Sequence, residues 1–203
     1  MQKFTTLTAV AAPLPQKNVD TDAIIRIEHC TGTPKEALGP YAFEMARRDP
    51  GFVLNQPRYR DAKILVAGEF FGTGSSREMA VWALAGMGFR CVIAPSFGQI
   101  FFGNCFQNGL LPVVLPAPVV EALLAQAAAP GAAPFTVDLE RQTVNGEHRF
   151  EIGARRKRML LEGLDEIGLT LALDAKIAAF QAADRERRPW VYEAVSNAHA
   201  RAK

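Results

Sequence analysis

The chain has 203 residues, of which 49% are apolar and 22% charged, and its formal net charge is +2. This length and composition are typical of a soluble domain with one sizeable core and an appendage. A charge so close to balance gives no reason to expect nucleic acid as a partner. Residues 155–158 form a local basic run, which we assign to a solvated helix face or a subunit rim.

The cysteines and the hydropathy indicate the compartment in which we expect the protein to work. Cys30, Cys91 and Cys105 are odd in number and lack C-x-x-C spacing, so we expect reduced, mostly buried thiols. No apolar run approaches the roughly 18 residues of a membrane span, and the first residues lack the apolar core of a signal peptide. We therefore expect a cytoplasmic protein without a membrane partner.

The first third of the chain combines a strand with an irregular excursion. Residues 4–11 form a strand-like run, and the polar cluster at residues 20–22 comes just before the apolar stretch 23–25, which we interpret as a buried strand. Residues 31–62 carry Gly, Pro and alternating charge, so we expect an excursion from the core with one helix near 34–48. Loops of this kind often shape a substrate site.

From Lys63 onward the pattern becomes regular. Apolar runs of strand length alternate with amphipathic runs of helix length, which favours right-handed crossovers and a parallel sheet. The sequence therefore predicts an α/β fold. The predicted elements are strand 63–68, helix 77–87, strand 91–95, helix 97–107, strand 110–115 and helix 118–128.

An antiparallel pair is predicted after this parallel core. The runs 135–144 and 148–152 flank Asn145-Gly146, which is the strongest short signal for a hairpin. A further helix is expected from residue 174 to about 187. We accordingly divide the chain into a domain at residues 1–173 and a C-terminal helix and tail at residues 174–203.

A glycine-rich turn joins the strand at 63–68 to the helix at 77–87. Its sequence is Gly72-Thr73-Gly74-Ser75-Ser76-Arg77-Glu78. A helix N-terminus has unpaired N–H groups and a positive dipole end, so this turn suits an anion or a hydroxyl driven toward an alkoxide. It is not a dinucleotide fingerprint, because Arg77 stands at the third glycine position, and no Gly-Lys-Ser/Thr follows for a P-loop.

The same turn has a structural interpretation. Ser75 and Glu78 fit the capping box S-x-x-E, with Ser75 as the N-cap. Capping does not exclude anion binding, because the N–H groups that contact a capping oxygen also stabilise negative charge on it. Arg77 opposes the helix dipole, and a bidentate carboxylate ligand would offset that cost. A site for a carboxylate-bearing substrate is our first hypothesis.

These residues carry a family resemblance. The string at 74–78 resembles the G-S-S-R-E-H motif of the swivelling domain in the aconitase superfamily. Further stretches, in order and across nearly the whole chain, resemble the small subunits of bacterial 3-isopropylmalate dehydratase. They are Asn18–Asp22, Phe52–Asn55, Val92–Phe97, Asn108–Pro112 and Gly163–Leu171.

The resemblance implies a swivelling β/β/α domain and a heterodimer or higher heteromer. In that family a large subunit binds a [4Fe-4S] cluster and carries most acid–base residues. This agrees with the scattered cysteines, which cannot hold a cluster by themselves, so no metal ligand is expected in this chain. The implied activity is that of a hydro-lyase that needs both subunits. It converts 2-isopropylmalate into 3-isopropylmalate by dehydration and rehydration, in leucine biosynthesis.

The resemblance also implies roles for the residues of the turn. Ser75 matches the general base, which must act as an alkoxide held by backbone N–H groups and a nearby cation. Ser76 and Arg77 match positions that hold a substrate carboxylate, the arginine through both arms of its fork. Gly74 supports the turn.

Asp20, Thr21 and Asp22 are expected to support the site. One interpretation is that an aspartate of this cluster braces Arg77 or the loop that faces the cluster. The other is a plain turn in which the Asp and Thr side chains bond to their own backbone. The sequence leaves both open.

Several residues depart from the family pattern. Met79 stands where the motif has histidine, and we expect it to pack in the core. Arg26 begins a charged stretch, 26–30, in a loop that helps to choose the group on the malate skeleton in this superfamily. Arg26 is either a rim charge or a substrate contact that would favour a charged or smaller substituent.

Two alternatives to the leading function therefore remain. A related hydro-lyase small subunit would act on methylmalate, citraconate or another substituted malate. A non-catalytic regulatory or RNA-binding paralogue is the alternative from another class. The nearly balanced charge and the presence of both Ser75 and Arg77 give it little support.

Overall fold

The computed structural model describes residues 1–192, so the end of the expected tail, 193–203, lies outside the described residues. The chain divides into two compact units, the first ending at Asp165 and the second starting at Glu166. The domain boundary that we placed after residue 173 stays a prediction. No helix in the described part of the chain is long and apolar enough to cross a membrane.

A parallel sheet forms the centre of the first unit. Its order is β2-β3-β4-β5, and all neighbours run parallel. The strands are β2 (Ala11–Leu14), β3 (Ile64–Ala67), β4 (Cys91–Ala94) and β5 (Leu111–Val114). The two central strands are buried along their whole length, as their unbroken apolar sequences require. The predicted α/β class is confirmed.

A second, antiparallel sheet has the order β1-β6-β7-β8. Its strands are β1 (Thr6–Ala9), β6 (Phe135–Asp138), β7 (Thr143–Val144) and β8 (His148–Arg149). The hairpin turn is confirmed, since Asn145 and Gly146 have φ of 53° and 76°. The single strand expected over 135–144 is wrong, because the chain turns between β6 and β7 with Gln142 at φ 56°. The expected strand 4–11 is also divided, between the two sheets.

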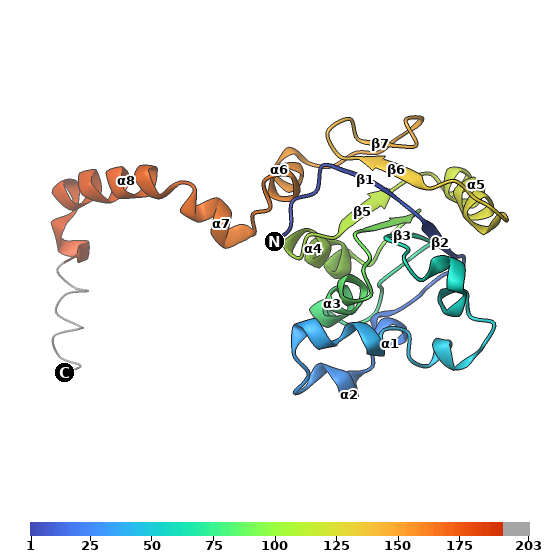
Figure 1. Cartoon of the computed structure of the whole chain (residues 1–203). Coiled ribbons are helices and arrows are strands. Elements are labelled where there is room, and N and C mark those ends of the chain that lie inside the picture. The colour runs from blue at the N-terminus through green and yellow to red at the C-terminus, as the bar shows by residue number, and fades with distance from the viewer. Residues whose placement is uncertain (193–203) are drawn as a thin grey trace. The chain divides into compact units, whose positions relative to one another are not determined.

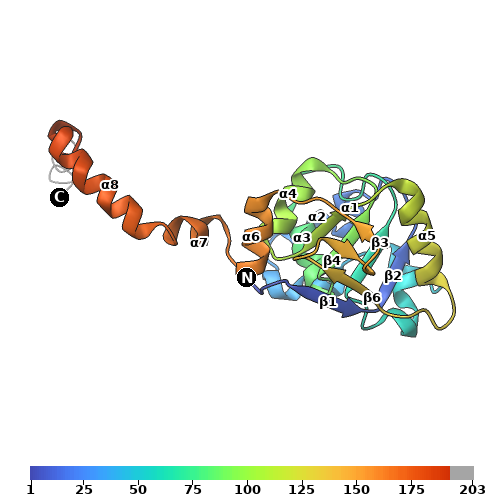
Figure 2. The same ribbon diagram turned by 90° about the horizontal axis from the view of Figure 1, so that it is seen from above.

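Alternation along the central strands gives the unit two cores. Leu65 of β3 belongs to a cluster with α3 (Glu78–Gly86), whereas its neighbour Ile64 belongs to a cluster with α5 (Ala117–Ala128) and β6. Figure 1 shows α1, α2 and α3 on one side of the parallel sheet and β6 and β7 on the opposite side. Figure 2 shows β1 and β6 side by side over the parallel strands.

Helix α4 (Gln99–Gln107) follows β4 and lies between the two cores. Phe101 and Cys105 belong to the first core, and Phe106 belongs to the second. Helix α6 (Ala154–Glu162) carries the basic run. The guanidinium of Arg156 lies 4.8 Å from the ring centroid of Phe106, so the run is exposed but also packs on an aromatic side chain.

The excursion is less regular than expected. The strand predicted at 23–25 is wrong, since α1 (Thr21–Ile24) begins there with Asp20 as N-cap, its Oδ1 accepting from the amide of Ala23 at 2.7 Å. Helix α2 (Ile27–Cys30) follows. The single helix expected near 34–48 is also wrong, because Gly39 and Pro40 interrupt it. In its place lie the 3-10 turns η1 (Lys35–Ala37), η2 (Gly39–Tyr41) and η3 (Ala46–Arg48), with η4 (Val53–Asn55) and η5 (Pro57–Tyr59) beyond.

The second unit contains α7 (Glu166–Leu171) and α8 (Asp174–Arg187), and α8 confirms the expected helix. Asp184 is its buried polar residue and accepts hydrogen bonds from Arg188 at 2.7 Å and Tyr192 at 3.1 Å. The bond to Arg188, the largest effect, together with Tyr192, holds the pKa of Asp184 below its usual value. This clasp ties the end of α8 to the residues that follow it.

A close backbone contact fixes the excursion against α3. A Cβ added at Gly86 would lie 2.8 Å from the Cα of Gly39, closer than carbon atoms approach. We expect Gly86→Ala to lower the free energy of unfolding by about 1 to 3 kcal/mol. Gly103→Ala, in open space on α4, should raise it by about 0.5 to 1 kcal/mol. Urea denaturation of both variants checks this, and shifts of the same sign would contradict the packing account.

Candidate functional site

The glycine-rich turn begins at the carboxyl end of β3, where tight packing forces its path. Gly72 has φ +72°, and a Cβ there would lie 2.2 Å from the ring of Phe101. A Cβ on Gly98 would in turn lie 2.3 Å from the carbonyl oxygen of Gly72. Only glycine fits either position, so the turn is clamped between β3 and the start of α4.

The polar cluster at residues 20–22 lies directly against this turn. The amide of Gly72 donates to the carbonyl of Val19 at 2.7 Å, and the amide of Thr21 donates to the carbonyl of Thr73 at 2.9 Å. Gly74 has φ +90°, and its missing Cβ would stand 3.4 Å from the Cβ of Asp20. The structure therefore brings together the two segments that the sequence singled out separately.

Ser75 is exposed, but its hydroxyl contacts a buried side chain. Its Oγ lies 3.2 Å from Oγ1 of Thr21, which is 1% exposed. Its role as N-cap is wrong, because α3 begins at Glu78 with Arg77 as N-cap. The amide of Arg77 donates to the carbonyl of Ser75 at 2.8 Å, which adds one further turn before the helix starts. Ser76, the next residue, is exposed beside it.

The predicted capping box fails because the carboxylate of Glu78 has another partner. It accepts at 2.6 Å from Nδ2 of Asn108, at the end of α4. The amide oxygen of Asn108 accepts from Nε1 of Trp82 and from Nζ of Lys35, both at 2.8 Å. Lys35 also lies over the ring of Trp82. One amide thus joins α3, α4 and the excursion. Asn108 was part of a matched motif, but only tertiary contacts reveal this role.

Arg77 is mostly buried and forms an ion pair with Asp22. The contact is the kind that we expected from an aspartate of the cluster. Its Nη1 is buried and is the atom that lies against Oδ1 of Asp22, although this contact is an ion pair and not an aligned hydrogen bond. The Arg77 side chain is 17% exposed and that of Asp22 57%. The guanidinium is therefore held by a charge contact with an exposed carboxylate, and Arg77 stands two residues along the chain from the exposed Ser75.

Helix α2 brings a thiol close to this ion pair. Burial raises the pKa of Cys30, while the charge of Arg77 opposes the shift and that of Asp22 adds to it. Arg26 pairs with Glu28, and its Nη1 lies 3.4 Å from Sδ of Met45. That arrangement occupies Arg26 within the excursion, so a substrate contact from it stays a prediction.

His29 was not given a role from the sequence, but it organises the same excursion. Its Nε2 lies 2.7 Å from a carboxylate oxygen of Glu44, and its ring stacks on Tyr41 with centroids 4.0 Å apart. The hydrogen bond from His29 is the main cause that lowers the pKa of Glu44. Met79 packs against the first core, which confirms the role expected for it.

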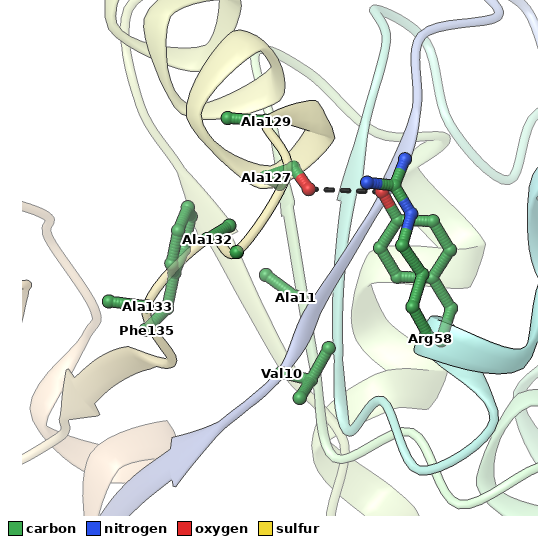
Figure 3. Close-up of a pocket in the computed structure, with 10 residues that line it drawn as sticks. Val10, Ala11, Arg58, Ala127, Ala129, Ala132, Ala133 and Phe135 are labelled. Carbon is green, nitrogen blue, oxygen red and sulfur yellow. Dashed lines mark hydrogen bonds between the residues drawn. The ribbon is translucent and has the colours of Figure 1, made fainter.

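The other candidate regions do not compete with this turn. Burial raises the pKa of the Cys91 and Cys105 thiols, and residues 1–192 bring no three His, Cys, Asp or Glu side chains into a metal-binding group. A separate pocket lies at the end of α5 (Figure 3), where Tyr59 donates to the carbonyl of Ala127 and Arg58 to that of Ala128, both at 3.0 Å. Its donors thus cap the helix.

Comparisons with known proteins agree with this geometry. The family model of the aconitase C-terminal domain matches residues 1–118. A second family model, of the C-terminal domain found in small subunits of 3-isopropylmalate dehydratase, matches residues 166–194. The fold and the turn therefore define an aconitase-type swivelling domain.

Individual relatives narrow the assignment. The 3-isopropylmalate dehydratase small subunit of Dinoroseobacter shibae is 51% identical over 201 residues, covering 94% of this chain and 100% of the relative. That of Rhodospirillum centenum is 52% identical over 200 residues, covering 94% and 98%. The crystal structure of 3-isopropylmalate dehydratase (leuD) from Methanocaldococcus jannaschii has a TM-score of 0.61 and 26% identity, covering 88% of this chain and 99% of that one. The chain belongs to the family of 3-isopropylmalate dehydratase small subunits.

The Asn108 network gives a test of what holds the start of α3. We expect Asn108→Ala to lower the free energy of unfolding by about 2 to 3 kcal/mol, because it leaves the partly buried Glu78 and Trp82 without their partner. Asn104→Ala is the matched control, since Asn104 contributes its backbone carbonyl to the network. Thermal or urea unfolding of both variants measures the difference. Equal losses would mean that the network adds no stability.

Proposed function

We propose that this chain is the cytoplasmic small subunit of a 3-isopropylmalate dehydratase. With a large subunit it would convert 2-isopropylmalate into 3-isopropylmalate by removal and readdition of water, in leucine biosynthesis. One observation carries the proposal: the exposed hydroxyl of Ser75, held by Thr21, comes two residues before Arg77, a mostly buried cation whose ion-pair partner is the exposed Asp22.

Arg77 is the proposed carboxylate holder. Its buried Nη1 lies against Asp22 without an aligned hydrogen bond, and a substrate carboxylate would supply a bidentate acceptor for the fork. Arg77 is also the N-cap of α3 and makes no side-chain hydrogen bond to the first-turn amides. Those amides and the exposed hydroxyl of Ser76 can add donors for the same anion. Asp22 would hold the guanidinium in place by its charge, without an aligned hydrogen bond to it.

Ser75 is the proposed general base. Its Oγ, as an alkoxide, would take the proton from one carbon next to a substrate carboxylate during dehydration, and the resulting hydroxyl would give a proton to the neighbouring carbon, the one that lost its hydroxyl, when water is added back. An alkoxide needs compensation, which the cation of Arg77, the helix start and the hydroxyl of Thr21 offer from this chain.

The rest of the chemistry belongs to the partner in this proposal. A [4Fe-4S] cluster held by the large subunit would supply a Lewis-acid iron for the leaving hydroxyl. The donor set of this chain agrees with that division, because Cys91 and Cys105 are buried in different cores.

The related hydro-lyases keep the same chemistry with another substituent on malate. Arg26, paired with Glu28 at the edge of the excursion, is the residue whose replacement would test which substituent the site accepts.

Purified chain should be combined anaerobically with a large subunit, iron and sulfide, and kcat/KM compared for isopropylmalate, methylmalate and citraconate. A preference for isopropylmalate, with no activity from this chain alone, supports the proposal. Activity without a partner, or preference for another substrate, would contradict it.

Replacement of Ser75 tests the base. We expect Ser75→Ala in the assembled enzyme to lower kcat by about 100- to 10,000-fold, since the proton acceptor is lost. Unfolding should change little, because Ser75 is exposed and is not the N-cap of α3. Ser76→Ala is the neighbouring comparison and should act mainly on KM. Near-normal kcat in Ser75→Ala would remove the base assignment.

Replacement of Arg77 tests the carboxylate contact. We expect Arg77→Lys to raise KM by about 10- to 100-fold and to lower kcat as well, because a point charge cannot replace a bidentate fork. Arg48→Lys is the matched control, since Arg48 also pairs with a carboxylate but is exposed. Its Nη2 lies 3.6 Å from Oε1 of Glu44. Steady-state kinetics of both variants decides the matter, and an unchanged KM in Arg77→Lys would assign Arg77 a purely structural role.

A further inference from the structure

Thr21 is an unusual residue in this fold because its hydroxyl is fully enclosed. Among the described residues, the buried polar or charged side chains are Thr21, at 1% exposure, and Asp184, at 4%. Asp184 satisfies its oxygens within its own unit, through Arg188 and Tyr192. The hydroxyl of Thr21 instead reaches across 54 positions of sequence to Ser75.

The backbone around Thr21 is held on both sides. Its amide donates to the carbonyl of Thr73 at 2.9 Å, and its carbonyl accepts from the amide of Ile25 at 2.9 Å. A Cβ added at Gly74 would lie 3.6 Å from Oγ1 of Thr21. The hydroxyl therefore has little freedom to move, apart from rotation of its hydrogen.

The hydrogen bonds of Thr21 can be accounted for one proton at a time. Oγ1 lies 3.2 Å from the carbonyl oxygen of Ser75 and 3.2 Å from Oγ of Ser75. A carbonyl oxygen can only accept, so while Thr21 donates there the Ser75 hydroxyl must be the donor to Oγ1. Once Ser75 has lost its proton, its Oγ can only accept, and the hydrogen of Thr21 can rotate to it.

We propose that Thr21 is a positioning residue for Ser75. The hydroxyl hydrogen of Thr21 changes its acceptor according to whether Ser75 is neutral or an alkoxide. In the neutral state Thr21 orients the Ser75 hydroxyl by accepting from it. In the alkoxide state it donates to the same oxygen, with no covalent bond broken at Thr21. The inference rests on the proposed role of Ser75 as base and extends it to a residue that does not touch the substrate.

Burial makes the contribution of Thr21 hard to replace. A hydrogen bond to an anion is stronger than one between neutral groups, and the Thr21 end of this one is buried while Ser75 is exposed. The charged and titratable groups around the turn are Asp20, Asp22 and Cys30 on the α1 and α2 side and Arg77 and Glu78 on the turn and α3. Substitution of Thr21 leaves all of these side chains in place in every variant.

The test compares Thr21→Val and Thr21→Ser in the enzyme assembled with its large subunit. Valine keeps the shape but has no proton to donate, and serine keeps the hydroxyl but loses the methyl group. For Thr21→Val we expect kcat to fall by about 10- to 100-fold, with KM changed less than about threefold. The rise of kcat with pH should also move to higher pH, because the alkoxide has lost a donor. Thr21→Ser should restore both values.

A second readout does not depend on turnover. In a crystal structure of the Thr21→Val chain, the Ser75 side chain should occupy more than one rotamer, and in Thr21→Ser a single one. An unchanged kcat and pH profile in Thr21→Val, or an equal loss in Thr21→Ser, would overturn the inference. If Thr21→Val fails to assemble, Thr21→Ala is measured in its place with the same expectations.

The outcome separates this inference from the proposed function. If Ser75→Ala keeps its activity, the base assignment fails whatever Thr21 does. If Ser75→Ala is inactive while Thr21→Val has normal kinetics, only the role of Thr21 fails.

Discussion

The candidate site depends on a backbone junction between two segments that are far apart in sequence. Residues 19–21 are joined to residues 72–73 by hydrogen bonds from the amides of Gly72 and Thr21, at 2.7 and 2.9 Å. The junction is possible because the turn approaches Phe101 and Gly98 so closely that only glycine fits at position 72. Everything proposed for the site follows from it, since it brings Thr21 under Ser75 and Asp22 beside Arg77.

The site is built as an open half rather than a closed cavity. Ser75 and Ser76 are exposed, whereas Thr21, which contacts Ser75, and Arg77 are mostly buried. If Ser75 and Arg77 have the roles proposed for them, such an arrangement orders them before any substrate arrives, which lowers the cost of positioning them in the transition state. It also leaves the exposed side free for a second protein, as the small-subunit family to which the chain belongs implies.

Support for the turn reaches well beyond its own residues. Asn108 ties Glu78 and Trp82 of α3 to Lys35 in the excursion, and the glycine pair at 39 and 86 allows that excursion to approach α3. The excursion is therefore attached to the helix that directly follows the turn. Changes in the excursion can reach the turn through these contacts, because packed elements transmit small displacements.

Local pattern in the sequence determined the alternating strands and helices from Lys63 onward, the hairpin at Asn145, and the glycine-rich turn with its serines and arginine. Those features depend on the periodicity of apolar residues and on glycine, which act over a few residues. The helix that Asp20 starts, where a strand was expected, also depends on a local contact, the bond from the amide of Ala23 to Oδ1 of Asp20. Tertiary structure alone decided that α3 begins after Arg77 and not after Ser75, since Glu78 pairs with Asn108. It also decided the partners of Thr21, Asp22 and Asn108. Each of these outcomes comes from hydrogen bonds or ion pairs between distant segments, whose energies no local pattern contains.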